Sequence, residues 1–282
     1  MNFSTLLDAA TLAAHLNTPG WVVCDVRHQL ADTAYGEQQY LAGHIPGAVF
    51  LHCDRDLSGP MTGHNGRHPL PSVAALSACL GHLGIARDTQ VVVYDDAQGM
   101  IAGRLWWLLR ALGHQRVALL DGGWQAWQAA GGEIETGAVS RPTSIYHPEN
   151  STYAGVTEAR EILSQLASPA MLLVDARSPD RFRGENETLD PLGGHIPGAR
   201  NRFFRDNLSA DGHFKSAEVL RAEWLQLLAE TPPSAVVHQC GSGVSACLNL
   251  LAMTHAGLEG SRLYAGSWSE WCSDTTRPVT LS

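Results

Sequence analysis

The sequence has few of the features that would tie it to a disulfide framework, a zinc site, a membrane or nucleic acid. Its cysteines form no CxxC pair and no Cys/His cluster at zinc spacing, which is typical of a reducing cytosol. Segment 1–20 lacks the basic start and long apolar run of a signal peptide, and no apolar run is long enough to span a membrane. The net charge of -9 argues against a nucleic-acid partner, which needs a broad basic surface. We therefore expect a protein of the cytoplasm.

What is present points to two related halves. At 282 residues the chain is long for one compact core and comfortable for two, and its 44% hydrophobic and 17% charged residues are ordinary for an enzyme. Three motifs occur twice in the same order: WVVCDVR at 21–27 with MLLVDAR at 171–177, GHIPGA at 43–48 and 194–199, and DGGWQAW at 121–127 with AGSWSEW at 265–271. Two copies are too few for a repeat array, so we interpret them as two homologous domains.

Short apolar runs alternate with helix-period segments in both halves. We predict strands at 22–25, 91–94, 117–120, 172–175, 236–239 and 262–264. We predict helices at 72–83, 101–112, 157–166, 217–229 and 245–255. Apolar strands separated by helices favour a parallel sheet that is buried on both faces. The expected fold class is therefore α/β, with two homologous domains that are each a parallel sheet flanked by helices.

The boundary between the two halves falls in a polar stretch. Segment 137–153 contains two prolines and several serines and threonines, as a linker does. We place the first domain at 1–138, the linker at 139–154 and the second domain at 155–282.

The segment 236–246, VVHQCGSGVSA, has the strongest chemical signal in the chain. It runs from a predicted buried strand through a glycine-bearing loop into an apolar helix, a position where open α/β folds bind their ligands. Gly241 and Gly243 allow successive N–H groups to converge on one point, and the following helix adds its positive end. A sulfur at Cys240 would be stabilised there as a thiolate or as a persulfide. The alternative is that Cys240 is a small core residue at the end of a strand.

These motifs together resemble the tandem-domain rhodanese family over nearly the whole chain. The CG[ST]GV[TS] form of the loop, which includes Gly241, Gly243, Val244 and Ser245, is most similar to the 3-mercaptopyruvate sulfurtransferase branch. Rhodaneses that prefer thiosulfate usually carry cations directly after the cysteine, where this chain has neutral residues. The resemblance implies two α/β domains, with an inactive first domain and an active site in the second domain that faces the domain interface.

The first domain has lost the reactive residue. The run VVVYD at 91–95 aligns with VVHQC at 236–240, which puts Asp95 at the position of the cysteine. A carboxylate cannot form a persulfide, and a cradle of N–H groups there would bind only its own side chain. We expect the first domain to be catalytically inactive.

The resemblance also implies a proton relay beside the cysteine. Ser242 matches the serine that the mercaptopyruvate branch uses beside the thiol, and Asp54 and His68 match the aspartate and histidine that join it from the first domain. A Ser-His-Asp chain can move a proton to the leaving enolate as sulfur departs. Ser242 could instead be a turn serine, and Asp54 and His68 could be surface loop residues.

The donor anion needs cationic partners. Arg181 matches the family arginine that pairs with the carboxylate or sulfonate oxygens of the donor, for which a bidentate guanidinium is suited. A second arginine is usual farther along the same loop, but that position holds Asp190. Arg67 is a second substrate-binding candidate, and Arg200 and Arg202 are further cations that could compensate. The alternative for Arg181 is a solvated surface residue.

Several other residues are better explained by structure than by catalysis. Asp25, Asp175, His44 and His195 recur in both halves, including the half without a cysteine, which favours a structural role. The tryptophans at 268 and 271 are expected to be packing anchors, and Cys247 a core residue.

Three functions fit these observations, in decreasing order of support. In the first, the Cys240 thiolate takes a sulfane sulfur from 3-mercaptopyruvate or thiosulfate and passes it to cyanide, a thiol or a thioredoxin-like acceptor, with no metal or organic cofactor. In the second, the chain is a thiosulfate-preferring rhodanese or a persulfide carrier that acts on protein thiols. The third, a cysteine phosphatase or arsenate reductase, needs a C-x5-R arginine where this chain has Ala246.

Overall fold

The computed structural model describes residues 2–166 and 170–281, and they form two compact units. The first unit is Met1–Gly59, Pro71–Ala154 and Ala210–His213, and the second is Pro60–Leu70, Gly155–Ser209 and Phe214–Ser282. Each unit therefore includes a short segment that lies, in sequence, within the other half.

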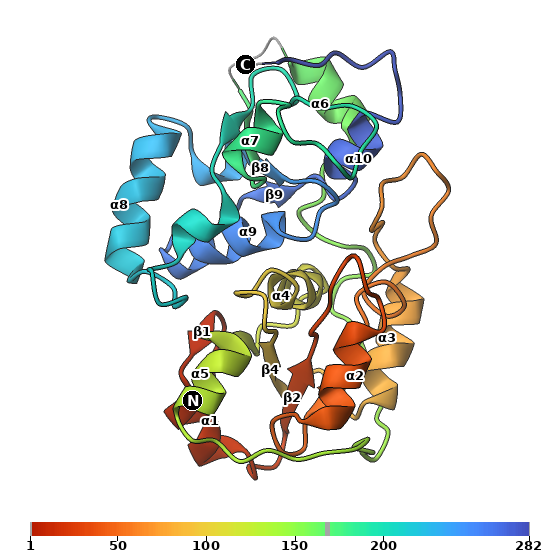
Figure 1. The fold of residues 1–282 in the computed structure, drawn as a ribbon, viewed down its shortest axis with the longest axis vertical. Coiled ribbons are helices and arrows are strands. Elements are labelled where there is room, and N and C mark those ends of the chain that lie inside the picture. Colours follow the sequence, from red (N-terminus) through yellow and green to blue (C-terminus); the bar gives the residue numbers. More distant parts are fainter. Residues whose placement is uncertain (1, 167–169, 282) are drawn as a thin grey trace. The chain divides into compact units, whose positions relative to one another are not determined.

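The first unit contains a five-stranded, fully parallel sheet. Its strands are β1 (Leu6–Leu7), β2 (Trp21–Asp25), β3 (Val49–Phe50), β4 (Gln90–Tyr94) and β5 (Val117–Leu120), in the order β1-β5-β4-β2-β3. Figure 1 labels β1, β2 and β4. Its helices are α1 (Ala9–His15), α2 (Tyr35–Ala42), α3 (Val73–His82), α4 (Ala102–Ala111) and α5 (Gly123–Ala129).

The second unit contains a similar parallel sheet of four strands, in which the strand equivalent to β1 is reduced to a single bridge. Its strands are β6 (Leu172–Asp175), β7 (Arg200–Asn201), β8 (Val236–Gln239) and β9 (Arg262–Leu263), in the order β7-β6-β8-β9. A single parallel bridge between Val156 and Leu263 stands where the first unit has β1. The helices are α6 (Ala159–Gln165), α7 (Pro179–Phe182), η1 (Phe204–Asn207), α8 (Ala217–Leu228), η2 (Pro233–Ala235), α9 (Ala246–His255) and α10 (Ser267–Trp271) (Figure 1).

Helices cover both faces of the second sheet, which explains the consecutive apolar residues at the start of β6 and β8. Leu172, Val174 and Val236 pack with α8 and α9, where Trp224 is fully buried. The alternate residues Leu173 and Val237 pack on the other face with α6 and α10. Because successive side chains of a strand point to opposite faces, both faces need apolar residues. The α/β fold with two homologous parallel sheets is confirmed.

The long predicted elements agree with the structure to within one or two residues at each end. Ser72 and Ser216 accept hydrogen bonds from the third residue after them and so cap α3 and α8, which begin one residue later. The short elements, among them β1, β3, α7 and α10, were not predicted, because two to five residues are too few to show a period.

The duplicated Asp-x-Arg motif forms the same buried ion pair in both units. The guanidinium of Arg27 binds Asp25 and the carbonyl of Gly43, each at 2.6 Å, and Arg177 binds Asp175 and Gly194 at 2.7 Å each. Each arginine also lies 4.7 Å from the ring of a tryptophan in the third duplicated motif. The guanidinium therefore joins all three repeated motifs, which explains their presence in both halves.

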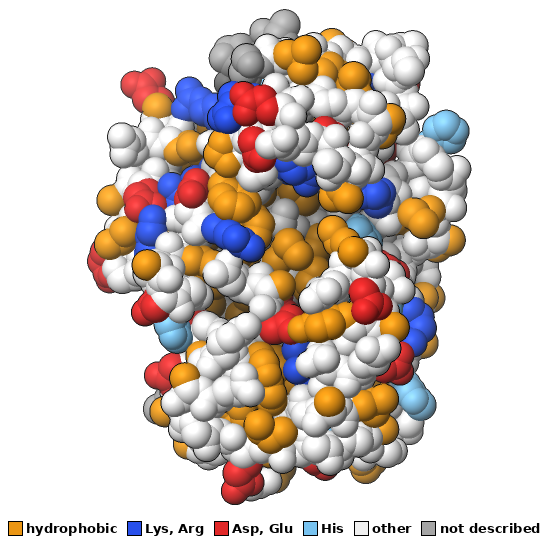
Figure 2. Space-filling model, viewed as in Figure 1, with side chains coloured by type: hydrophobic (Ala, Val, Ile, Leu, Met, Phe, Trp, Pro, Cys, Tyr) orange, Lys and Arg blue, Asp and Glu red, His pale blue; other side chains and the backbone are white. Residues whose placement is uncertain are grey.

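The surface is mixed in charge. On the face drawn in Figure 2, acidic and basic side chains lie among one another, although the chain as a whole carries a net charge of -9. Within the described residues, no helix combines the length and the hydrophobicity needed to cross a bilayer.

Candidate active site

Cys240 lies in the loop between β8 and α9, at the carboxyl end of a central strand of the second unit. The loop turns at Gly243, whose φ of 78° favours glycine, and a Cβ atom there would lie 2.1 Å from the carbonyl oxygen of Ala265. The turn directs the N–H of Gly243 at Cys240 Sγ, 3.2 Å away. The loop thus has the strand–turn–helix geometry that the sequence predicted.

The amide cradle of the sulfur is smaller than expected. We predicted that several N–H groups would converge on Cys240, and in the described part of the chain only the one from Gly243 is hydrogen-bonded to it. Cys240 is 2% exposed. Burial disfavours the charge of Arg177, but Asp175, Glu187 and Cys240 all favour it and raise its pKa above the usual value. The buried Arg177 guanidinium thus interacts electrostatically with Cys240 as well as with its acidic partners.

A second segment fixes the backbone of the loop. The N–H of Cys240 donates to Ser267 Oγ at 3.1 Å, and the Cys240 carbonyl accepts from the N–H of Trp268 at 3.0 Å. Ser267 has a φ of 52° and replaces Gly123 of the first copy, which has a φ of 58°. Ser267 was not singled out from the sequence, where the available signal was its alignment with Gly123 in the duplicated motif.

The structure brings together two of the three predicted relay residues. His68 Nδ1 lies 2.7 Å from Ser242 Oγ, and both residues are buried. His68 belongs to Pro60–Leu70, the early segment that packs with the second unit. Gly66, with a φ of 83°, allows this segment to approach Gly266 closely, and the N–H of Arg67 donates to Ser269 Oγ at 3.1 Å. The hydroxyl and the imidazole are placed for proton exchange.

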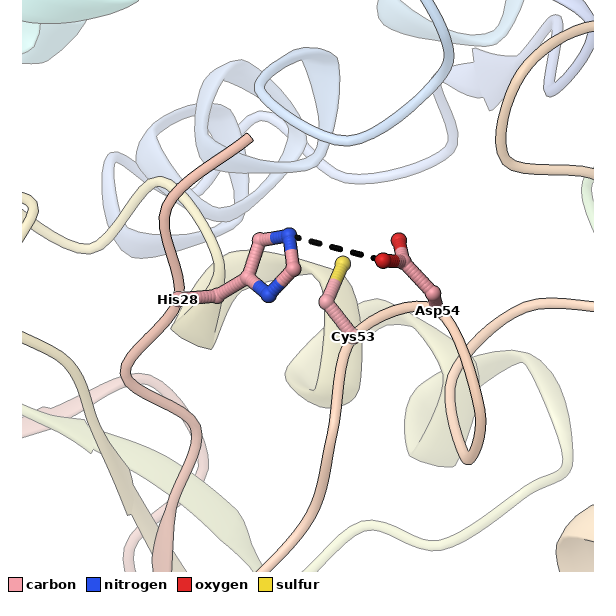
Figure 3. A group of neighbouring side chains, drawn as sticks. All are labelled: His28, Cys53 and Asp54. Carbon is pink, nitrogen blue, oxygen red and sulfur yellow. Dashed lines mark ion pairs between the residues drawn. The ribbon is translucent and has the colours of Figure 1, made fainter. Parts of the chain in front are cut away.

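Asp54, the third relay candidate, lies in the first unit. Its carboxylate is 3.8 Å from Nε2 of buried His28, and with Cys53 these residues place a nitrogen, a sulfur and an oxygen within 4.8 Å of one another (Figure 3). These are groups that can hold a metal ion. Burial raises the pKa of the Cys53 thiol to about 12, so an ion would have to displace its proton. We assign no metal to this group, and the role of Asp54 in the relay stays a prediction.

Two guanidinium groups lie over the cysteine loop. A Cβ atom on Gly241 would be 3.0 Å from Arg67 Nη2 and 3.5 Å from Arg181 Nη2. Arg181 forms a bidentate pair with Glu187, with Nη2 2.8 Å from each carboxylate oxygen, and Arg67 Nη1 pairs with Asp190. Both predicted substrate arginines thus reach the residue after the cysteine. Glu187 was not singled out from the sequence.

The remaining candidates have structural partners. Arg202 binds Glu223 at 2.7 Å and Arg200 binds the carbonyl of Leu227, so both are engaged with α8 rather than with the loop. Val244 is buried in the loop, and Ser245 directly precedes α9. The thiol of Cys247 donates to the Gly243 carbonyl at 3.4 Å, which supports the turn.

The first unit contains an equivalent loop after β4, and the side chain of Asp95 occupies its centre. The carboxylate of Asp95 accepts hydrogen bonds from the backbone N–H groups of Ala97, Gly99, Ile101 and Ala102, at 2.8–2.9 Å. Burial raises the pKa of Asp95, whereas these four N–H groups stabilise its ionised form. The carboxylate thus occupies the cradle and has no sulfur to transfer.

Comparison with known proteins gives one consistent result. A Rhodanese-like domain model matches residues 8–130 and 158–274. The chain is 46% identical to a probable 3-mercaptopyruvate sulfurtransferase of Pseudomonas aeruginosa, over 99% of both chains. It is 42% identical to a putative thiosulfate sulfurtransferase of Mycobacterium tuberculosis, over 97% of this chain and 96% of that one. The solved 3-mercaptopyruvate sulfurtransferase of Leishmania major superposes with a TM-score of 0.85 at 34% identity, over 95% of this chain and 74% of that one.

Two domain matches, whole-length relatives and a shared architecture agree with the motifs from which the resemblance was inferred. The chain belongs to the rhodanese-like family of sulfurtransferases and carries two copies of its domain.

Proposed function

We propose that this sulfurtransferase takes sulfur from 3-mercaptopyruvate onto Cys240 and passes it, as a persulfide, to a thiophilic acceptor. The observation that supports this most is the placement of Cys240 Sγ, which faces the N–H of Gly243 while two guanidinium groups lie over the next residue. A nucleophile beside an anion-binding pair is the arrangement that a small anionic sulfur donor requires.

Donor binding is assigned to Arg67 and Arg181. Nη2 of Arg67 and Nη1 of Arg181 lie 3.0 Å and 3.6 Å from the Cβ position of Gly241. Within the described residues, neither of these two nitrogens donates to a protein acceptor. Their N–H groups can bind the carboxylate of the donor and hold its sulfur near Cys240.

Sulfur transfer then needs no oxidant. The Cys240 thiolate attacks the donor sulfur, an S–S bond forms, and the bond between sulfur and carbon breaks with its electrons moving to the carbon fragment. That fragment leaves as the enolate of pyruvate, which takes up one proton. Ser242 and His68, joined at 2.7 Å, are the groups we assign to deliver it.

The second half-reaction regenerates the free Cys240 thiolate. An acceptor nucleophile attacks the outer sulfur of the persulfide, forms a bond to it and releases the Cys240 thiolate. Cyanide, a low-molecular-weight thiol and a thioredoxin-like protein have the required chemistry. We place the reaction in the cytoplasm, because all six cysteines are free thiols, as is usual for proteins of a reducing compartment.

A thiosulfate-preferring enzyme is the second candidate. The relative from Mycobacterium tuberculosis is named a putative thiosulfate sulfurtransferase, and Asp190 stands where the mercaptopyruvate branch usually has a second arginine. In this reaction, sulfite would leave as the S–S bond of thiosulfate breaks. We favour mercaptopyruvate because Gly241 and Ser242 are neutral where thiosulfate-preferring rhodaneses usually carry cations, and because Arg67 lies over the loop in place of the missing arginine.

Intact-mass measurement after incubation with mercaptopyruvate alone tests the proposal. We expect one sulfur atom to be added to the wild-type chain and to a Cys79→Ser control, in which a half-buried thiol of the first unit is replaced. We expect no addition and no turnover in Cys240→Ser. Turnover that survives in Cys240→Ser would refute the assignment.

A further inference from the structure

Two buried carboxylates accompany the two substrate arginines. The side chains of Glu187 and Asp190 are each 3% exposed, whereas those of Arg67 and Arg181 are 27% and 21% exposed. All four residues belong to the second unit. The acids therefore lie behind the guanidinium groups, which face the more open side.

Each carboxylate is tied to more than one group. Glu187 binds Arg181 through both oxygens, lies 3.5 Å from Arg177 Nη1, and accepts the N–H groups of Leu189 and Asp190 at 2.9 Å and 3.1 Å. Asp190 pairs with Arg67 and lies 3.6 Å from Arg181 Nη2. The two arginines are thus bridged by acids and held over Gly241. A Cβ atom at position 241 would lie 3.0 Å from Arg67 Nη2, which is a tight contact, so the glycine leaves room for this arrangement.

The same contacts set the charge of the donor site. Two guanidinium groups carry two positive charges and the two carboxylates carry two negative ones, so the four groups cancel. Asp175 and Arg177 cancel in the same way. Burial raises the pKa of Asp190, whereas the pairing with Arg67 opposes this shift. A bound donor therefore accepts hydrogen bonds from the two substrate arginines, but the arginines and acids of the site together carry no net positive charge.

We propose that Asp190, together with Glu187, is a specificity-determining residue that makes the site favour donors with one negative charge over donors with two. The proposal rests on the proposed function. Mercaptopyruvate carries one charge at neutral pH and thiosulfate carries two. The second charge of thiosulfate is repelled by the buried carboxylates, and no excess cation compensates it.

The test is the ratio of kcat/KM for thiosulfate to kcat/KM for mercaptopyruvate in Asp190→Asn. Asparagine has the same shape and keeps an oxygen that accepts from Arg67, so the variant removes the charge and retains the positioning. We expect the ratio to rise roughly tenfold, the effect of one charge at several ångströms in a partly buried site.

The matched control is Glu185→Gln. Glu185 lies on the same segment and pairs with Arg183 at 2.7 Å, but its side chain is 52% exposed, so the variant has the same change of net charge at the surface. We expect its ratio to stay within about twofold of the wild type, because water screens an exposed charge. Thermal unfolding of both variants shows whether either one is misfolded.

The outcomes separate this proposal from the function on which it rests. A ratio that stays unchanged in Asp190→Asn, falls, or rises equally in Glu185→Gln overturns the role of Asp190, while a Cys240 persulfide formed from mercaptopyruvate still upholds the function. If neither donor adds sulfur to Cys240 in the wild type, the proposed function itself fails.

Discussion

The Nδ1 atom of His68 lies 2.7 Å from the hydroxyl oxygen of Ser242, although 174 residues separate them in the sequence. The contact exists because Pro60–Leu70 packs with the second unit rather than with the half of the sequence to which it belongs. A buried imidazole bonded to the hydroxyl two residues after Cys240 is suited to moving a proton, and mercaptopyruvate and thiosulfate differ in whether the group that leaves must take up a proton.

Replacement of His68 by asparagine should therefore slow turnover of mercaptopyruvate and leave turnover of thiosulfate nearly unchanged. We expect kcat with mercaptopyruvate to fall by roughly 10²- to 10⁴-fold, because its enolate must be protonated, as is usual when a general acid is lost. Turnover of thiosulfate should change little, because sulfite leaves without a proton. Steady-state kinetics with both donors at equal cyanide measures the difference. An equal loss with both donors would remove His68 from the relay.

Ser267 should affect the cysteine loop through two separable effects. Ser267→Ala removes the acceptor of the Cys240 N–H and keeps a side chain at a φ of 52°, whereas Ser267→Gly removes the acceptor and the strain together. We expect the alanine variant to lose about 1–3 kcal/mol of unfolding free energy and the glycine variant to lose about 1 kcal/mol less than that. Both should turn over more slowly, since both free the loop. Urea unfolding with parallel kinetics provides the check, and equal stabilities would show that the backbone is not strained.

Asp95 should contribute to stability and not to catalysis. Asp95→Ala leaves four N–H groups without their acceptor, two of them buried and two partly buried, and we expect a loss of about 3 kcal/mol or more, because charge-assisted hydrogen bonds contribute about 1.5–3 kcal/mol each. The residual kcat of folded protein should equal that of the wild type. Asp88→Asn, at an exposed position of the same unit, is the control and should change neither quantity. A specific loss of kcat in Asp95→Ala would contradict an inactive first domain.

His238 should make the second unit sensitive to acid. Burial lowers the pKa of His238 to about 3, while an unfolded histidine titrates near pH 6.5. Since the folded state binds the proton less well, the stabilisation is fully present above about pH 6.5 and declines as the pH falls toward 3, by at most about 1.4 kcal/mol per pH unit.

The matched variant is His238→Val, because valine stands at the aligned position 93 of the first unit. Between pH 7 and pH 4, the unfolding free energy of this variant should fall less steeply than that of the wild type. The difference in slope should correspond to the uptake of about one proton on unfolding. Tryptophan fluorescence follows the unfolding, and Trp224, whose ring lies 5.5 Å from that of His238, contributes to the signal. Identical slopes in the two proteins would show that His238 takes up its proton without unfolding.

Much of this protein follows from sequence pattern alone. Apolar runs such as β4 and β8 need burial on both faces, which commits each half to a parallel sheet covered by helices. The glycine at 243 requires a turn after β8, and the alignment of Asp95 with Cys240 identifies which half lacks a nucleophile. These are local properties, so a single segment contains the information.

Contacts between segments far apart in the sequence could not be predicted from the sequence pattern. The sequence suggested a missing second arginine, whereas the tertiary structure brings Arg67 to the Cys240 loop and pairs it with Asp190, the residue that stands in the arginine's place. It also makes Glu187 a partner of Arg181 and Ser267 the acceptor of the Cys240 N–H. The sequence by itself determined the fold, the duplication and the position of the candidate nucleophile, because periodicity and turn chemistry are short-range. Only the tertiary structure decided which charges surround that sulfur, because electrostatic partners are chosen by proximity in space.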